Sequence, residues 1–115
     1  MLNNVILIGR LTADPELRYA GENAVANFNL AVDRIGSDET DFIRIVVWRK
    51  QAENVSKYLA KGSLAAVEGR LQIRSYDDKE GVRRIAAEVV ARSVQFLDSK
   101  KRRDDSEYAE QDSLF

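Results

Sequence analysis

Residues 40–62 read TDFIRIVVWRKQAENVSKYLAKG, and in this stretch an alternating segment is followed directly by a helical one. Aliphatic side chains occupy every second position of Thr40–Arg49, which predicts a β-strand. In Gln51–Lys61 the apolar residues recur three and four residues apart, which predicts one short helix with Gly62 as its C-terminal stop. The chain is therefore expected to pass from a strand into a helix.

Strand signals dominate the rest of the sequence. Runs rich in Val, Ile and Leu, bounded by turn residues, predict strands at Val5–Leu11, Val25–Asp33, Leu64–Tyr76 and about Val82–Leu97. The segment between the first two strands contains Asp-Pro and Gly-Glu-Asn breakers and is expected to be an irregular connection. A short polar turn after Val25–Asp33 predicts that the second and third strands form an antiparallel pair.

The predicted order places the helix between the third and fourth of five strands. This order matches a five-stranded oligonucleotide/oligosaccharide-binding (OB) barrel, an all-β fold with one short helix. Gly9 and Gly69 lie in the middle of the first and fourth strands, where long strands that curl into a barrel need bends. We expect one OB-fold domain over residues 1–99 and a disordered, charged C-terminal tail over residues 100–115.

The composition excludes several kinds of chemistry. The chain has 115 residues, which fits one domain, and it contains no Cys and no His. Disulfides, thiolate or imidazole metal sites and catalysis by Cys or His are therefore excluded, and we expect neither a metal nor a cofactor. The acids at positions 38–41 and 77–80 lie in predicted turns, where carboxylates commonly cap the backbone. We expect a binding protein, not an enzyme.

The hydropathy of the chain and its first residues indicate where in the cell the protein is expected. No apolar run approaches the length of a membrane span, and Met1–Asn4 lacks the basic region of a signal peptide. We therefore expect a cytoplasmic protein that does not associate with membranes.

Charge is divided unevenly along the chain. Five acids and no base fall in residues 104–115, whereas residues 1–103 hold 18 bases against 14 acids, a net charge of +4. A basic body with an acidic tail is typical of proteins that bind a polyanion. The alternative is a solubilising tail on a domain with no such partner.

The third predicted strand has two faces of different character. One face is aliphatic and is assigned to the core or to a subunit contact. The other face carries two aromatic rings flanking a guanidinium, which suits stacking on bases and contact with phosphates. The aliphatic face consists of Ile43, Ile45 and Val47, and the aromatic face of Phe42, Arg44, Val46 and Trp48.

The fourth predicted strand repeats this arrangement. Arg70, Gln72, Arg74 and Tyr76 share one of its faces, and Leu71, Ile73 and Ser75 share the other. Further cations are expected nearby, because Lys50 and Lys61 bracket the helix and Arg84 opens the fifth strand. The alternative is that the rings belong to the barrel or to a subunit interface and that the arginines lie on solvated strand edges.

Several longer motifs resemble the bacterial single-stranded DNA-binding protein (SSB) family over residues 1 to about 97. They are NVILIGRL (4–11), DPELRY (14–19), DF (41–42), VVWRKQAE (46–53), KGS (61–63), EGRL (68–71) and EVV (88–90). The resemblance implies a non-catalytic OB-fold subunit that forms a homotetramer and coats single-stranded DNA with little sequence preference. It implies a nucleoid-associated role in replication, recombination, repair or DNA uptake.

The resemblance also implies roles for particular residues. Its stacking rings fall on Phe42, Trp48 and Tyr76. Its phosphate-binding cations fall on Arg44, Lys50, Lys61, Arg74 and Arg84, with Arg10 and Arg18 as further candidates. The alternative from another class is an OB-fold protein-interaction module, such as a primosomal or plasmid accessory factor, whose aromatic face binds a protein.

Two departures from the family pattern carry expectations of their own. Ile35-Gly36 stands where the family usually has another stacking ring, which predicts a smaller site size or weaker binding. The ending keeps Asp112 and Phe115 but has Leu114 where the family has Pro, and the usual long linker before it is almost absent. This ending is expected either to dock on replication and recombination proteins or to act as an electrostatic shield over the basic face.

Overall fold

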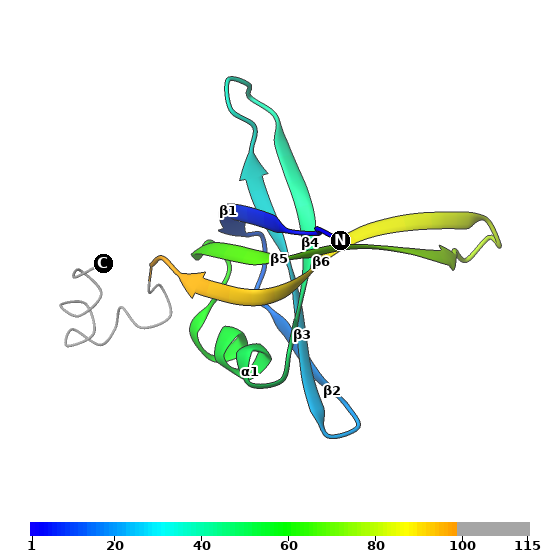
Figure 1. The fold of residues 1–115 in the computed structure, drawn as a ribbon, viewed down its shortest axis with the longest axis horizontal. Coiled ribbons are helices and arrows are strands. Elements are labelled where there is room, and N and C mark those ends of the chain that lie inside the picture. Colours follow the sequence, from blue (N-terminus) through cyan, green and yellow to red (C-terminus); the bar gives the residue numbers. More distant parts are fainter. Residues whose placement is uncertain (99–115) are drawn as a thin grey trace.

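The computed structural model describes residues 1–98, so the predicted tail lies outside the described residues. Seven elements follow one another along the chain, and Figure 1 shows them as a barrel with two long hairpins that project from it. They are β1 (Val5–Leu11), β2 (Glu16–Ala20), β3 (Asn23–Asp33), β4 (Thr40–Trp48), α1 (Arg49–Tyr58), β5 (Leu64–Asp77) and β6 (Arg83–Phe96).

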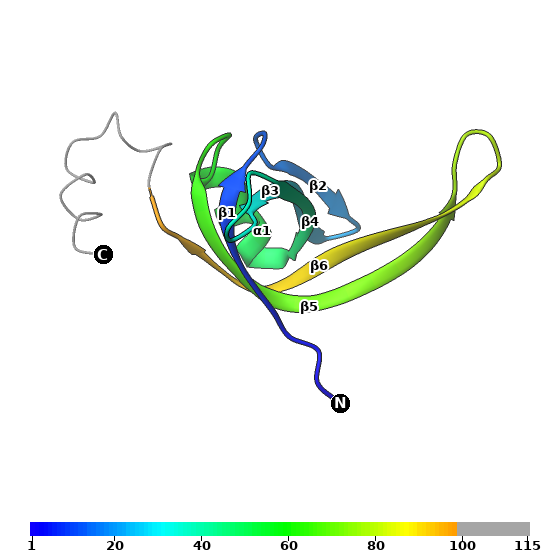
Figure 2. The same ribbon diagram turned by 90° about the horizontal axis from the view of Figure 1, so that it is seen from above.

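Five of the strands close into a ring, as seen from above in Figure 2. The sheet runs β1-β5-β6-β4-β3, and β3 returns to β1 through the pairs Arg10↔Ala31 and Leu11↔Leu30. β3 and β4 are antiparallel, whereas β4 and β6 are parallel. This closed ring with a single helix after the third of its five strands confirms the predicted OB barrel.

The inner faces of the strands and one side of α1 form the core. The alternation predicted for β3 and β4 is confirmed, because Phe28, Leu30, Ile45 and Val47 are all buried. Ala52 and Val55 bring α1 onto the same core. The remaining buried apolar members are Leu11, Ala24, Ala26, Leu59, Ala65, Val67 and Val89.

The glycines predicted at bends lie where strands approach closely. A Cβ at Gly9 would collide with the backbone carbonyl oxygen of Ala31, across the β1–β3 closure. A Cβ at Gly69 would collide with the carbonyl oxygen of Val90, at a register shift where Glu68 pairs with Ser93 and Gly69 with Ala91, so that Arg92 is the extra residue of a bulge in β6. Both positions therefore require glycine for the barrel to close.

Most predicted boundaries lie within two residues of those in the structure, and two predictions differ by more. The expected irregular connection contains a strand, β2, which pairs with β3 outside the ring and has five exposed residues. The helix ends at Tyr58, and Gly62 is not its stop but lies in the following turn with a φ of 87°. The chain leaves the helix early because the Gly62 N–H donates to the carbonyl of Leu11 at 2.8 Å, which ties this turn to β1.

Candidate nucleic-acid interface

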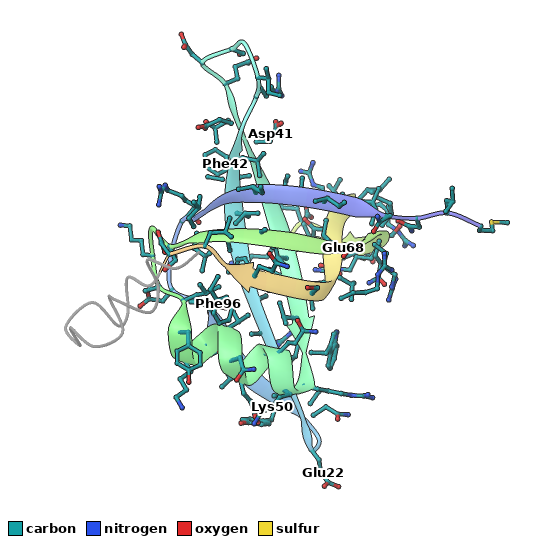
Figure 3. All side chains as sticks on the ribbon, turned by 60° about the vertical axis from the view of Figure 1, so that its left-hand side comes forward. Glu22, Asp41, Phe42, Lys50, Glu68 and Phe96 are labelled. Carbon is teal, nitrogen blue, oxygen red and sulfur yellow. The ribbon has the colours of Figure 1, made fainter. Side chains whose placement is uncertain are left out.

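The outer face of β4 carries the aromatic side chains predicted for it. Phe42 is 68% exposed and Trp48 is 42% exposed, whereas Ile45 and Val47 between them point into the core. Figure 3 places Phe42 on the projecting β3–β4 hairpin and Lys50 near the start of α1, at the other end of β4. The two rings are therefore spread along one strand, with Arg44 between them.

The β5–β6 hairpin continues this outer face. Arg44 on β4 is in register with Glu88 on β6, and Glu88 is in register with Gln72 on β5, so the three side chains form one row across three strands. Strand alternation then places Arg70, Arg74 and Tyr76 on the same surface as Gln72. Tyr76 is 42% exposed.

A cavity of about 620 Å³ opens on this surface. Trp48 and Arg18 belong to one cross-strand row, because each is in register with Val25 of β3. Phe42 and Tyr76 are not among the lining residues, but each lies two positions along its strand from a lining arginine. The lining consists of Arg18, Tyr19, Ala20, Val25, Asn27, Arg44, Val46, Trp48, Arg70, Gln72, Arg74, Glu88 and Val90.

Two of the predicted phosphate-binding arginines meet at one buried carboxylate. Arg44 Nε lies 3.3 Å from Glu88 Oε2, and Arg74 Nε lies 3.6 Å from Glu88 Oε1. The Arg74 guanidinium also lies over the Tyr76 ring, 5.6 Å from its centroid. One face of Tyr76 is thus covered by a cation, in a geometry that favours cation–π attraction.

Of the other predicted cations, Arg18 lines the cavity, whereas the rest lie farther along the surface or away from the cavity. Arg84, at the base of the β5–β6 turn, donates to Asp78 Oδ2 at 2.9 Å. This hydrogen bond, followed by those from the backbone N–H groups of Val82 and Glu80, lowers the pKa of the Asp78 carboxyl. Asp78 thus orders the turn and holds Arg84 on the same side of it.

Lys50, Lys61 and Arg10 are exposed and do not line the cavity. The Lys61 backbone N–H donates to Asp14 Oδ1. The Lys61 side chain therefore lies on the turn after α1. Arg10 donates to the Gly62 carbonyl at 2.9 Å and pairs with Asp98 at 3.3 Å. The structure therefore gathers Arg18, Arg44, Arg74 and Trp48 at one cavity and leaves Arg10 and Lys61 at the turn beside β1.

Tyr19 and Glu88 are among the cavity residues that were not predicted from the sequence. Tyr19 on β2 is 59% exposed and lines the cavity, but the short exposed strand that carries it gives no alternating signal. Glu88 has a signal that could have identified it, because it is an acid inside the apolar run IAAEVVA at positions 85–91. An acid in such a run is expected to be buried and paired.

Within residues 1–98 no group of three or more potential metal-ligating side chains comes together. No helix of this part of the chain is both long enough and apolar enough to cross a membrane.

Comparisons with known proteins cover most of the chain. Residues 2–97 match the model of the single-strand binding protein family. A single-stranded DNA-binding protein of Halalkalibacterium halodurans is 61% identical over 106 residues, covering 87% of this chain and 63% of the relative. A single-stranded DNA-binding protein of Staphylococcus aureus is 59% identical over 111 residues, covering 90% of this chain and 70% of the relative.

A third relative, single-stranded DNA-binding protein 3 of Listeria innocua, is 56% identical over 107 residues, covering 88% of this chain and 67% of the relative. The chain thus spans 63% to 70% of the length of these relatives. The match to the family model covers nearly the whole described structure, including the barrel, α1 and both hairpins. The chain belongs to the single-strand binding protein family.

Proposed function

We propose that this chain binds single-stranded DNA without catalysis and with little preference for sequence, and that it coats and protects exposed strands during replication, recombination, repair or DNA uptake. The observation that carries the proposal is the continuous outer face of β4, β5 and β6, on which exposed rings share strand faces with arginines. The relatives whose names contain single-stranded DNA binding support it.

The three rings and the cations have complementary roles in this proposal. Phe42, Trp48 and Tyr76 stack on bases, which contributes about 1–3 kcal/mol per base and tolerates any base. Arg44 and Arg74 bind phosphates beside the rings, with Arg18, Lys50 and Arg84 as further contacts and Lys61 and Arg10 at the end of the path. Duplex DNA keeps its bases stacked on one another, so the rings favour unpaired strands.

Trp48 reports directly on this proposal, because it is the one tryptophan of the chain and lines the cavity. Its fluorescence is expected to be quenched on titration with oligo(dT), oligo(dA) and mixed-sequence oligonucleotides at similar affinity. Matched RNA oligonucleotides establish whether the sugar matters. Quenching by a protein partner but not by oligonucleotides would instead support the protein-interaction module.

We also propose that the chain assembles into a homotetramer, as the resemblance implies. Leu71, Ile73 and Ile85 share the face of the β5–β6 hairpin that continues the barrel interior, and they are 43%, 55% and 72% exposed. A second copy of the chain is the proposed occupant, since identical apolar faces can cover one another in a symmetric interface. This face lies opposite the arginines, so assembly leaves the proposed binding surface open.

The assembly is tested by light scattering on the full chain. The expected mass is four times that of one chain, and Ile73→Glu is expected to lower it. Ile35→Glu is the matched control, because Ile35 is fully exposed on the β3–β4 turn and is expected to leave the mass unchanged. A wild-type chain that elutes as a monomer would refute this part of the proposal.

The ending of the chain lies outside the described residues, and we propose that it recruits replication or recombination proteins through Asp112, Leu114 and Phe115. We further propose that residues 1–99 suffice to bind DNA in the cytoplasm, at the nucleoid. Deletion of residues 112–115 is expected to reduce capture of such partners without reducing DNA affinity. A deletion that only raises DNA affinity would instead support an electrostatic shield.

A further inference from the structure

Glu88 is the one buried acid among residues 1–98, with 6% of its surface exposed. It lies on β6 between Arg44 of β4 and Gln72 of β5, in register with both. A carboxylate at this place is unexpected on a surface that binds a polyanion, because its charge opposes that of the phosphates. Its burial therefore calls for a role in the free protein or in the complex.

The groups that face Glu88 are all hydrogen-bond donors. Gln72 Nε2 donates to Glu88 Oε1 at 3.3 Å, and the Nε atoms of Arg44 and Arg74 lie 3.3 Å and 3.6 Å from its two oxygens. An ionised carboxylate only accepts, so it suits three donors that approach from two strands. A glutamine could not replace it, because its amide NH2 would face another donor on one side.

The contacts use the Nε side of each guanidinium. Arg44 Nε is buried and has no hydrogen bond of its own, so the carboxylate 3.3 Å away is its counter-charge. The nitrogen that each ion pair with Glu88 uses is Nε, for Arg44 and for Arg74, and not a terminal guanidinium nitrogen. Their side chains are 38% and 48% exposed. Glu88 thus contacts each guanidinium at its Nε edge, and the terminal N–H groups can donate to an anion.

We propose that Glu88 is a positioning residue that fixes Arg44 and Arg74 for the phosphates of a single strand, an inference that rests on the proposed function. The carboxylate ties two side chains from different strands to one point, so the spacing between their free edges is set before DNA arrives. Because Arg74 also covers one face of Tyr76, the same anchor sets the ring against which a base stacks.

Positioning and simple charge repulsion predict opposite results for Glu88→Gln. Removal of a negative charge beside the phosphates strengthens binding if the carboxylate only repels them. Removal of the anchor weakens binding if the carboxylate positions the arginines, because each long side chain must then be ordered by the DNA. The ordering of one such side chain lowers affinity about twofold to tenfold.

The experiment titrates oligo(dT) into the wild-type chain, Glu88→Gln and Glu53→Gln, with Trp48 fluorescence as the readout over a range of salt concentrations. Glu53→Gln is the matched control, since it makes the same charge change at an exposed position on α1. Glu88→Gln is expected to bind at least threefold more weakly than wild type, with a salt slope reduced by about 0.7 for each phosphate that is no longer bound. Glu53→Gln is expected to bind like wild type or slightly more tightly.

A double-mutant cycle separates positioning from a fold defect. Methionine at positions 44 and 74 leaves no guanidinium for Glu88 to position, so the weakening caused by Glu88→Gln is expected to be absent in the Arg44→Met, Arg74→Met background. In the free protein, the NMR order of the Arg44 and Arg74 Nε–H groups is expected to fall in Glu88→Gln. This measurement requires no DNA, and the NMR order is expected to be unchanged if Glu88 does not hold the two arginines.

The outcomes are distinct for the two claims. Wild-type binding with an equal or tighter Glu88→Gln overturns the positioning role alone. A drop in affinity that persists unchanged in the double-methionine background assigns Glu88 to the fold and also overturns the positioning role. Absence of quenching in the wild-type chain overturns the proposed function, and the positioning role with it.

Discussion

Substitution of Phe42 separates DNA binding from stability more cleanly than substitution of any other ring. Phe42 is 68% exposed, so about a third of its side chain contributes to the fold. Full burial of a phenylalanine contributes about 1.5–3 kcal/mol, and Phe42→Ala is therefore expected to cost about 1 kcal/mol or less in the free energy of unfolding. A base stacked on this ring contributes about 1–3 kcal/mol to binding.

The expected result is a reduction of about fivefold to 150-fold in affinity for oligo(dT), since about 1.4 kcal/mol corresponds to tenfold. Trp48 is unchanged in this variant, so fluorescence quenching measures the affinity, and urea unfolding measures the stability. Phe96→Ala is the matched control. Phe96 is 38% exposed and packs on Tyr58 with ring centroids 6.0 Å apart, away from the lining of the cavity.

Phe96→Ala is expected to reduce stability more than Phe42→Ala and to leave the affinity for oligo(dT) unchanged. Figure 3 shows Phe42 on the projecting β3–β4 hairpin and Phe96 near α1. If Phe42→Ala binds oligo(dT) within twofold of the wild-type affinity, Phe42 does not stack on a base and the path assigned along β4 is wrong.

Three further predictions concern the turns and the bulge. The pKa of Asp78 is lowered in the folded state, so its contact with Arg84 stabilises the β5–β6 turn above the ordinary aspartate pKa of 3.8. This stabilisation is expected to disappear as the pH falls through the pKa of the folded state. An NMR titration of the Asp78 carboxyl measures that pKa, and a midpoint at or above 3.8 would contradict the prediction. Gly69→Ala is expected to destabilise the chain by about 1–3 kcal/mol or more in urea, because the new Cβ collides with the Val90 carbonyl; an unchanged midpoint would contradict the bulge. Ile35 lies on the fully exposed tip of the β3–β4 hairpin, and Ile35→Trp adds a ring on which a base can stack. The number of nucleotides bound per protein, measured by fluorescence titration, is therefore expected to increase. An unchanged number would show that the DNA path does not reach this tip.

The fold could be predicted from the sequence wherever burial alternates along a strand. Val25–Asp33 and Thr40–Arg49 each bury one face, so their pattern of two predicted both the strands and the inward side chains. β2 was missed because all five of its residues are exposed, and its pairing with β3 is a tertiary feature with no local pattern. The early end of α1 has the same origin, since the Gly62 contact with β1 spans distant parts of the sequence.

Some features of the candidate site could also be predicted from the sequence, and others could not. Phe42, Trp48 and Tyr76 could be separated from the core because each shares a strand face with an arginine. The meeting of Arg44 and Arg74 at Glu88 could not be predicted, because it depends on the registers of β4 with β6 and of β6 with β5. In the sequence the arginines are separate cations, whereas the structure joins these two through one buried acid.

The proposed function requires that the exposed rings beside the arginines bind single strands. Its most direct test is the affinity of the Phe42→Ala, Trp48→Ala, Tyr76→Ala triple variant for fluorescently labelled oligo(dT), measured by anisotropy and compared with the wild-type chain under the same salt conditions. The expected affinity of the triple variant is lower by at least about a hundredfold, because three bases no longer stack and each loses at least about 1 kcal/mol. A folded triple variant that binds labelled oligo(dT) as tightly as wild type would contradict it.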